Sequence, residues 1–274
     1  MAGKLSNEAL NRIFNAYDIV GDVAIIRTTP ATEKYSTTIA KAIMQTHKNV
    51  KTVLLQASPV HGDFRTRKLK LVMGENKAIT MHVENGCKFV VDLENTYFSP
   101  RLSYERMRVA SQVKPKEVVV NMFAGVGCFS LIIARHSSAS KIYSIDINPK
   151  AVQLMRENIR INGFFGRVVP LQGDAKEIIE NKLKNNADRV IMPLPEKALQ
   201  YLSFAILALK KRKGWIHYYD FEHATREENP IQKVTRRVTE KLERLNMSFK
   251  ISNGRIIRST GPNWYQIVLD IQTI

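Results

Sequence analysis

The chain has 274 residues, of which 44% are hydrophobic and 24% are charged, as in an ordinary globular protein and unlike a disordered or collagen-like chain. Lys and Arg number 42 against 25 for Asp and Glu, and the resulting formal net charge of +17 favours a polyanionic partner such as nucleic acid. No apolar run reaches the roughly 18 residues of a membrane span, and the N-terminus has no signal-peptide pattern, so we expect a cytoplasmic protein without a membrane contact. Two cysteines are too few for a disulfide framework or a four-cysteine zinc site, and we expect no metal.

Residues 1–94 mix helices and strands without regular alternation. Two apolar runs, Leu69–Met73 and Ala78–Glu84, flank Gly74–Asn76, which predicts a β-hairpin. The other expected elements are helices over 5–16 and Tyr35–His47 and strands at Asp22–Thr28, Thr52–Gln56 and Cys87–Leu93. This part is therefore predicted to be a small α+β domain that contacts RNA.

From Val118 onward, strands and helices alternate regularly. This alternation predicts a parallel sheet with helices on both faces, and the last two strands are expected to form an antiparallel pair at one edge. Expected strands are 117–125, Lys141–Ile147, Val168–Gln172, Arg189–Met192, Trp215–Tyr219, Phe249–Ile256 and Trp264–Asp270; expected helices are Phe129–His136, 149–162, Ala175–Leu183, Glu196–Lys211 and Pro230–Leu245. Residues 95–274 are thus predicted to form a Rossmann-like α/β domain with a seven-stranded, mostly parallel sheet, which resembles the class I S-adenosylmethionine-dependent methyltransferases.

A glycine-containing loop follows the first of these strands. Gly125 and Gly127, preceded by Phe123 and Ala124, lie between a buried strand and a helix. Small residues at such a position let a ligand approach the backbone beside the free N–H groups of a helix N-terminus. A simple tight turn would explain the two glycines equally well.

Two carboxylates follow the next two strands. Asp146, followed by Ile147, is placed to accept hydrogen bonds from both hydroxyls of a ribose. Asp174, followed by Ala175, is placed to accept one from the exocyclic amine of an adenine. Either residue alone could instead cap a helix. Because parallel strands end at the same sheet edge, the three groups together predict a site for S-adenosylmethionine.

A dinucleotide site is the main alternative for this loop. Its G-x-G-x-x-G fingerprint requires a small third residue, and Ser130 at that position does not exclude it. The adenine-binding position of Asp174 and the Asp146–Pro149 ending of the second strand favour S-adenosylmethionine instead.

Four stretches resemble the archaeal tRNA (guanine-37-N1)-methyltransferases and their wyosine-pathway relatives, over residues 15–274. They are Gly62–Arg65; Tyr97–Arg106; the glycine loop with Ile145–Pro149; and Arg189–Pro195 with Ile216–Tyr219. The Phe-Ser-Pro-Arg…Glu-Arg part of the second stretch is specific to that family, whereas the loop is shared by many methyltransferases. The resemblance implies methyl transfer from S-adenosylmethionine to N1 of guanosine-37 in the anticodon stem-loop of tRNA. We expect a monomer.

The resemblance also implies residue roles. N1 of guanine must lose a proton before it attacks, so catalysis needs a general base near N1 and a donor at O6. By similarity, Glu105 is the base and Arg65 the O6 partner; Arg67 is a close alternative to Arg65, and Glu105 could instead form an exposed ion pair with Arg108. Pro193 is the third expected catalytic residue. Around the cofactor the resemblance implies Tyr97, Arg106, Phe123, Ala124, Gly125, Gly127, Asp146, Ile147, Asp174, Ala175 and Pro193, and around the substrate Arg65, Arg67, Ser99, Arg101, Leu194, Pro195 and Tyr218.

Three features depart from the pattern of this family. Asn121 stands where Asp is usual, and we expect weaker cofactor binding. Pro193-Leu-Pro195 replaces Asn-Leu-Pro, and this form resembles a branch that also methylates carbon 7 of 4-demethylwyosine. The length leaves no room for the N-terminal tRNA-elbow-binding domain of many archaeal members, so we expect the tRNA to be bound less extensively.

Other functions remain open from the sequence alone. An aminocarboxypropyl transferase of wyosine biosynthesis has the same fold and cofactor, but such relatives lack the Leu-Pro pair found here at Leu194 and Pro195. A catalytically inactive RNA-binding protein would also explain the charge of +17. The basic first domain and the Lys210–Lys213 cluster are expected to hold tRNA phosphates, which makes binding salt-dependent.

Overall fold

The computed structural model describes residues 16–59, 62 and 64–274. The helix predicted over 5–16 falls outside this range except for its last residue. The chain divides into two compact units, Met1–Arg101 and Leu102–Ile274. Among the described residues, no helix is both long and apolar enough to cross a membrane.

The first unit is built on a four-stranded sheet of order β1-β2-β3-β4, with β1 at Asp18–Val20, β2 at Val23–Ile26, β3 at Thr52–Gln56 and β4 at Leu69–Gly74. Strands β2 and β3 are parallel, and the chain between them forms a 3-10 turn (Glu33–Tyr35) and helix α2 (Ser36–Thr46). Ile39, Ala40 and Ile43 of α2 pack with Val53 of β3 in one apolar core. The helix and strand predicted around these positions are thus present, whereas β1 was not anticipated.

The predicted hairpin between Leu69–Met73 and Ala78–Glu84 is wrong. β4 pairs with β3 instead, and β5 (Ile79–Glu84) pairs with β6 (Cys87–Asp92) in a separate two-stranded sheet. The turn of the real hairpin is Asn85-Gly86, and both residues have positive φ, 47° and 74°. Asn-Gly is the strongest two-residue hairpin signal because a type I′ turn needs left-handed backbone at both positions. Gly74–Asn76 is the weaker of the two signals.

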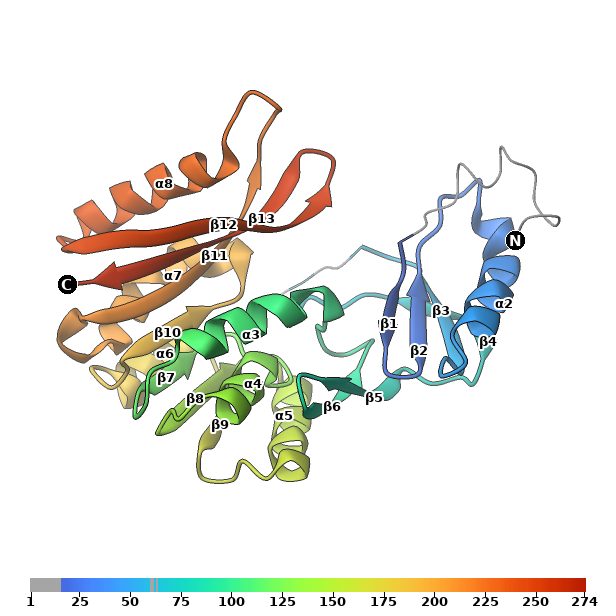
Figure 1. Cartoon of the computed structure of the whole chain (residues 1–274), viewed down its shortest axis with the longest axis horizontal. Coiled ribbons are helices and arrows are strands. Elements are labelled where there is room, and N and C mark those ends of the chain that lie inside the picture. Colours follow the sequence, from blue (N-terminus) through green and yellow to red (C-terminus); the bar gives the residue numbers. More distant parts are fainter. Residues whose placement is uncertain (1–15, 60–61, 63) are drawn as a thin grey trace. The chain divides into compact units, whose positions relative to one another are not determined.

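The second unit contains the predicted seven-stranded sheet (Figure 1). Its order is β12-β13-β11-β10-β7-β8-β9; β7 to β11 run parallel, whereas β13 is antiparallel to β11 and β12 to β13. The strands are β7 (Val118–Asn121), β8 (Lys141–Asp146), β9 (Val168–Gln172), β10 (Arg189–Met192), β11 (Gly214–His223), β12 (Phe249–Gly261) and β13 (Trp264–Thr273). The predicted fold class is therefore confirmed.

The helices of this unit follow the capping signals in the sequence. They are α3 (Ser103–Gln112), α4 (Cys128–His136), α5 (Pro149–Asn162), α6 (Ala175–Ile178), α7 (Pro195–Ala208) and α8 (Pro230–Arg244). The Asn148 side chain accepts from the N–H groups of Lys150 and Ala151, and Gly163 ends α5 at φ 73°. α6 continues as a π-helical turn, Ile179–Leu183. The helix predicted to reach Lys211 ends earlier, and a 3-10 turn follows at Lys210–Arg212. α6, α7 and α8 share one apolar core with the sheet.

A buried polar cluster joins β10, β11 and β13 inside this unit. Arg189, 1% exposed, donates from Nε and Nη2 to the two carboxylate oxygens of Glu117, at 2.8 and 3.2 Å. Its Nη1 lies 2.8 Å from Nε2 of His217, and Nδ1 of His217 lies 2.6 Å from Oδ1 of Asp270. Because a guanidinium only donates, Nε2 of His217 accepts, so Nδ1 carries the proton and donates to Asp270. His217 is therefore neutral in the fold.

Stability is expected to fall as the pH drops below the ordinary histidine range. Burial lowers the pKa of His217, so the unfolded chain takes up a proton near pH 6.5 that the folded chain does not. The free energy of unfolding should then decrease by up to about 1.4 kcal/mol per pH unit below about pH 6.5. Urea unfolding at neutral and mildly acidic pH measures this slope. His217→Gln should flatten it, and an unchanged slope would contradict the assignment.

Candidate active site

The topology of the second unit brings the predicted cofactor groups to one sheet edge. β7, β8, β9 and β10 are parallel neighbours, so their carboxyl ends lie together. The glycine loop follows β7, Asp146 ends β8, Asp174 follows β9, and Pro193 follows β10. The edge beyond such strand ends is where open α/β sheets bind their ligands.

The glycine loop has a backbone that side chains would disturb. Gly125 and Gly127 have φ of 56° and 93°, in the left-handed region. A Cβ atom at Gly127 would lie 2.8 Å from Cδ1 of Leu131 and 3.0 Å from Cγ of Met155. Because Gly127 is also the N-cap residue of α4, the loop and the free N–H groups of the helix N-terminus lie next to each other.

Asp146, at the end of β8, is hydrogen-bonded to the backbone of the glycine loop. Its Oδ2 accepts from the N–H of Gly125 at 2.6 Å, and its Oδ1 accepts from the N–H of Asn148 at 2.9 Å. Burial raises the pKa of Asp146, against the effect of these two donors. A carboxylate has about four acceptor positions, so two remain for the hydroxyls of a ribose.

Asp174 is held in place by one backbone and one side-chain donor. It caps α6 by accepting from the N–H of Lys176 at 2.7 Å, and its Oδ2 accepts from the hydroxyl of Tyr201 at 2.7 Å. Tyr201, on α7, meets the ring of Phe123 edge to face, with centroids 5.3 Å apart. The aromatic pair thus lies beside Asp174, and Tyr201 was not among the predicted site residues.

Asn121 and Ser130 form a buried polar contact behind the loop. Asn121 is 0% exposed, and its Nδ2 donates to Oγ of Ser130 at 3.1 Å; Ser130 in turn lies 2.7 Å from Oγ of Ser144. The Ser130 hydroxyl thus hydrogen-bonds to one side chain from β7 and one from β8. Among the described residues, Oδ1 of Asn121 is a buried oxygen without a hydrogen-bond donor.

The remaining second-unit residues differ in their access to solvent. Ile147 is exposed, Ala124 and Ala175 are buried, Pro193 and Leu194 are half-buried, and Pro195 begins α7. Arg106 is 3% exposed. Tyr218 lies in the apolar core, and its hydroxyl donates to Asp220 at 2.8 Å. Tyr218 is thus 0% exposed in this structure.

Glu105 is buried, so the alternative of an exposed ion pair with Arg108 is wrong in its exposure. It is 1% exposed, yet it does pair with Arg108, whose Nε and Nη2 each donate to one carboxylate oxygen at 2.8 Å. The hydroxyl of Tyr219 donates to Oε1 at 2.7 Å. Tyr219, one residue beyond the predicted Tyr218, is thus the tyrosine of this strand that contacts the predicted base.

In the first unit, the structure distinguishes the two candidate arginines. The Arg65 guanidinium lies over the Tyr97 ring, 4.3 Å from its centroid. Arg67 instead donates to Oε1 of Gln56 at 3.3 Å, and burial lowers its pKa. Ser99 is 6% exposed, and Arg101 donates to Asp18 at 2.6 Å. Arg65 and Tyr97 are therefore the predicted residues of this unit that contact each other.

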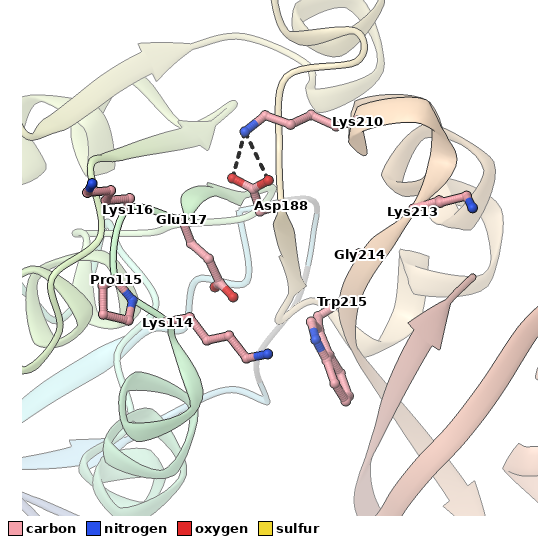
Figure 2. Close-up of a pocket in the computed structure, with 9 residues that line it drawn as sticks. All are labelled: Lys114, Pro115, Lys116, Glu117, Asp188, Lys210, Lys213, Gly214 and Trp215. Atoms are coloured by element: carbon pink, nitrogen blue, oxygen red, sulfur yellow. Dashed lines mark hydrogen bonds and ion pairs between the residues drawn. The ribbon is translucent and has the colours of Figure 1, made fainter.

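The Lys210–Lys213 cluster lies away from the cofactor edge. Its two end residues, Lys210 and Lys213, line a pocket of about 400 Å³ together with Lys114, Lys116 and Trp215 (Figure 2). These residues come from the segment before β7 and from the segment between α7 and β11. This is the amino-terminal edge of the sheet, and Lys210 there forms an ion pair with Asp188 at 2.7 Å. Among the described residues, no cluster of three or more His, Cys, Asp or Glu is arranged to hold a metal ion.

Family models match both parts of the chain. The TRM5/TYW2 methyltransferase domain matches residues 80–248, and the TYW2 N-terminal domain matches residues 1–77. The chain belongs to the TRM5/TYW2 methyltransferase family.

Relatives in the TRM5/TYW2 family support this over nearly the whole chain. The tRNA (guanine(37)-N(1))-methyltransferase Trm5b of Pyrococcus abyssi is 38% identical over 94% of this chain and 74% of its own length. The tRNA 4-demethylwyosine(37)-methyltransferase Taw21 of Saccharolobus solfataricus is 36% identical over 95% of this chain and 94% of its own length.

Solved structures of TRM5/TYW2 proteins also superpose on nearly the whole chain. Crystalline P. abyssi Trm5b superposes with a TM-score of 0.87 at 37% identity, covering 98% of this chain and 78% of that one. The complex of aTrm5 with tRNALeu gives 0.82 at 33% identity, covering 96% and 73%. Pyrococcus horikoshii TYW2 in complex with MeSAdo gives 0.79 at 28% identity, covering 99% and 95%.

Replacing Asp146 with alanine is expected to weaken S-adenosylmethionine binding by about 10- to 100-fold, since hydrogen bonds to a charged group contribute roughly 1.5–3 kcal/mol. The variant loses the acceptor of the Gly125 N–H as well as the ribose contacts. Calorimetric titration measures the change. Asp188→Ala, at the opposite sheet edge, is the control and should bind normally; an unchanged Kd for Asp146→Ala would remove Asp146 from the site.

Proposed function

We propose that this protein methylates N1 of guanosine-37 in tRNA with S-adenosylmethionine as the methyl donor. The observation that carries the proposal is the meeting of the glycine loop, Asp146, Asp174 and Pro193 at one sheet edge in a TRM5/TYW2 chain. The left-handed loop backbone and the remaining acceptor positions of the two carboxylates fit an adenosine-containing group.

The chemistry assigns a task to each proposed residue. When bound, S-adenosylmethionine supplies an electrophilic methyl group on its sulfonium. Glu105 takes the proton from N1 of guanine, so that the electron pair left on the nitrogen is free to attack. Arg65 donates to O6, where negative charge develops as the proton leaves. Tyr97 orients Arg65 through the contact of its ring with the guanidinium.

RNA binding follows from charge and from the location of the base. A base at position 37 lies in a folded loop and has to be unstacked to reach a catalytic pocket. The net charge of +17 favours contacts with the phosphates, so affinity should fall as salt rises. Lys116 and Lys213, in the pocket of Figure 2, are proposed phosphate contacts distant from the cofactor edge. We propose a monomer that acts in the cytoplasm.

Methylation of 4-demethylwyosine is a second candidate function. Pro193 cannot supply the side-chain amide that asparagine would offer to guanine at this position. In addition, the match to Taw21 extends over 94% of that protein. Both features favour acceptance of the tricyclic base.

One experiment tests these functions together. The protein is incubated with labelled S-adenosylmethionine and tRNA transcripts carrying G37 or A37, and with tRNA carrying 4-demethylwyosine, and the modified atom is mapped by nucleoside mass spectrometry. Methyl at N1 of G37 is expected, and methyl on carbon 7 would support the second candidate. Release of methylthioadenosine in place of S-adenosylhomocysteine would indicate aminocarboxypropyl transfer. Binding to tRNA without turnover on any of these substrates would indicate a catalytically inactive RNA-binding protein.

A further inference from the structure

Arg108 bridges two buried carboxylates. Besides its two hydrogen bonds to Glu105, its Nη1 donates to Oδ2 of Asp270 at 2.6 Å and its Nη2 to Oδ1 at 3.0 Å. The three side chains are 11%, 1% and 3% exposed. A single guanidinium is thus shared between Glu105 and Asp270, and this trio has a net charge of −1.

Asp270 is itself fixed from two further strands. His217 on β11 donates to its Oδ1 at 2.6 Å, and Asn253 on β12 donates to its Oδ2 at 3.3 Å. These donors and Arg108 hold the pKa of Asp270 well below its usual range, although burial acts in the opposite direction. Asp270 therefore remains ionised wherever the protein is folded and active.

The hydrogen bonds between Arg108 and Asp270 affect how Arg108 holds the Glu105 carboxylate. The hydrogen bonds to Asp270 hold the Arg108 guanidinium in one plane, which fixes the direction of both Glu105 oxygens. The other groups facing Glu105 are the hydroxyl of Tyr219 from β11 and the guanidinium of Arg255 from β12, whose Nη1 lies 3.9 Å from Oε2.

We propose that Asp270 is a positioning residue for Glu105, acting through Arg108 to orient the carboxylate that accepts the N1 proton. The proposal rests on the role of Glu105 as general base given above. The proton leaves N1 of guanine, an O–H bond forms on Glu105, and the electron pair stays on N1. Asp270 and Arg108 exchange no proton in this step.

Asp270→Asn tests this because it removes the charge and keeps the shape. The single-turnover methylation rate should fall about 3- to 10-fold, because the Glu105 oxygens are no longer held in one direction. KM for tRNA and S-adenosylmethionine should stay the same. The matched control is Glu117→Gln, which removes another buried carboxylate paired with a buried arginine but leaves Arg108 untouched. A wild-type rate in Asp270→Asn, or the same loss of rate in both variants, overturns the proposal.

Arg108→Lys gives a second test if Asp270→Asn folds poorly, because lysine keeps the charge but loses the planar fork. Its plateau rate should also fall, and a wild-type rate would overturn the positioning role. Glu105→Gln in the same assay distinguishes a failure of the general-base role of Glu105 from a failure of the positioning role of Asp270. If Glu105→Gln turns over like the wild type, Glu105 is not the base and both ideas fail. If Glu105→Gln is inactive and the Asp270→Asn rate matches the wild type, only the role of Asp270 fails.

Discussion

Glu105→Gln is expected to lower the methylation rate constant by about 10²- to 10⁴-fold, the usual contribution of a general base. Glutamine has nearly the same shape as glutamate, and its carbonyl oxygen in the Oε1 position still accepts from Nη2 of Arg108 and from Tyr219. Its NH2 group can neither accept from Nε of Arg108 nor take a proton from N1. Because Glu105 is separate from the glycine loop, Asp146 and Asp174, the Kd for S-adenosylmethionine should stay unchanged. Glu105→Ala is a harsher change, since it also leaves a cavity beside a buried guanidinium.

Single-turnover methylation and calorimetric titration of the cofactor measure the two quantities for Glu105→Gln separately. Glu240→Gln is the matched control: Glu240 is 55% exposed on α8 and forms only a surface pair with Arg236. It should behave as the wild type in both assays. A parallel loss of turnover and cofactor affinity in Glu105→Gln would mean that the base is misassigned.

Arg189→Met is expected to destabilise the protein by about 3–5 kcal/mol, the typical effect of removing one partner from a buried ion pair. Methionine fills similar space, but it leaves the Glu117 carboxylate without its two donors and His217 without the group that fixes its tautomer. The carbonyl of Gln112, at the end of α3, also loses a donor at 2.8 Å.

Urea unfolding followed by circular dichroism compares Arg189→Met with Lys210→Met. Lys210 pairs with Asp188, the neighbour of Arg189, but its side chain is 46% exposed, and exposed pairs contribute at most about 1 kcal/mol. The double variant Glu117→Gln, Arg189→Met should recover part of the loss. Equal losses of unfolding free energy for Arg189→Met and Lys210→Met would show that burial does not increase the contribution of the Arg189 pair to stability.

The second unit was predictable because its signals are local. Strands buried on both faces are apolar runs, and Asn148, Pro149 and Gly163 mark the ends of α5 in the sequence itself. Once the strands are known to be parallel, the topology places Gly125, Asp146 and Asp174 at one edge without knowledge of the side chains. The first unit was less predictable, because an apolar run such as Leu69–Met73 does not specify its partner strand.

The contacts of Glu105 could not have been read from the sequence in the same way. Its i,i+3 partner Arg108 was evident, but its burial was not, because the polar run of α3 looks like a solvated helix face. Asp270 is 162 residues away from Arg108 and carries no motif. The contact of Tyr219 with Glu105 was not predicted either, because neighbouring residues of a strand face opposite sides of the sheet and the sequence does not say which side faces Glu105.

The pairing of Arg108 with Asp270 also constrains biosynthesis. Helix α3 emerges from the ribosome long before β13, which supplies Asp270, so the nascent chain passes through a stage in which Glu105 and Arg108 lack their third partner. Contacts between such distant positions form late because the loop between them must close first. A ribosome-bound intermediate lacking β13 would thus carry Glu105 and Arg108 before Asp270 is available to hold the guanidinium in place.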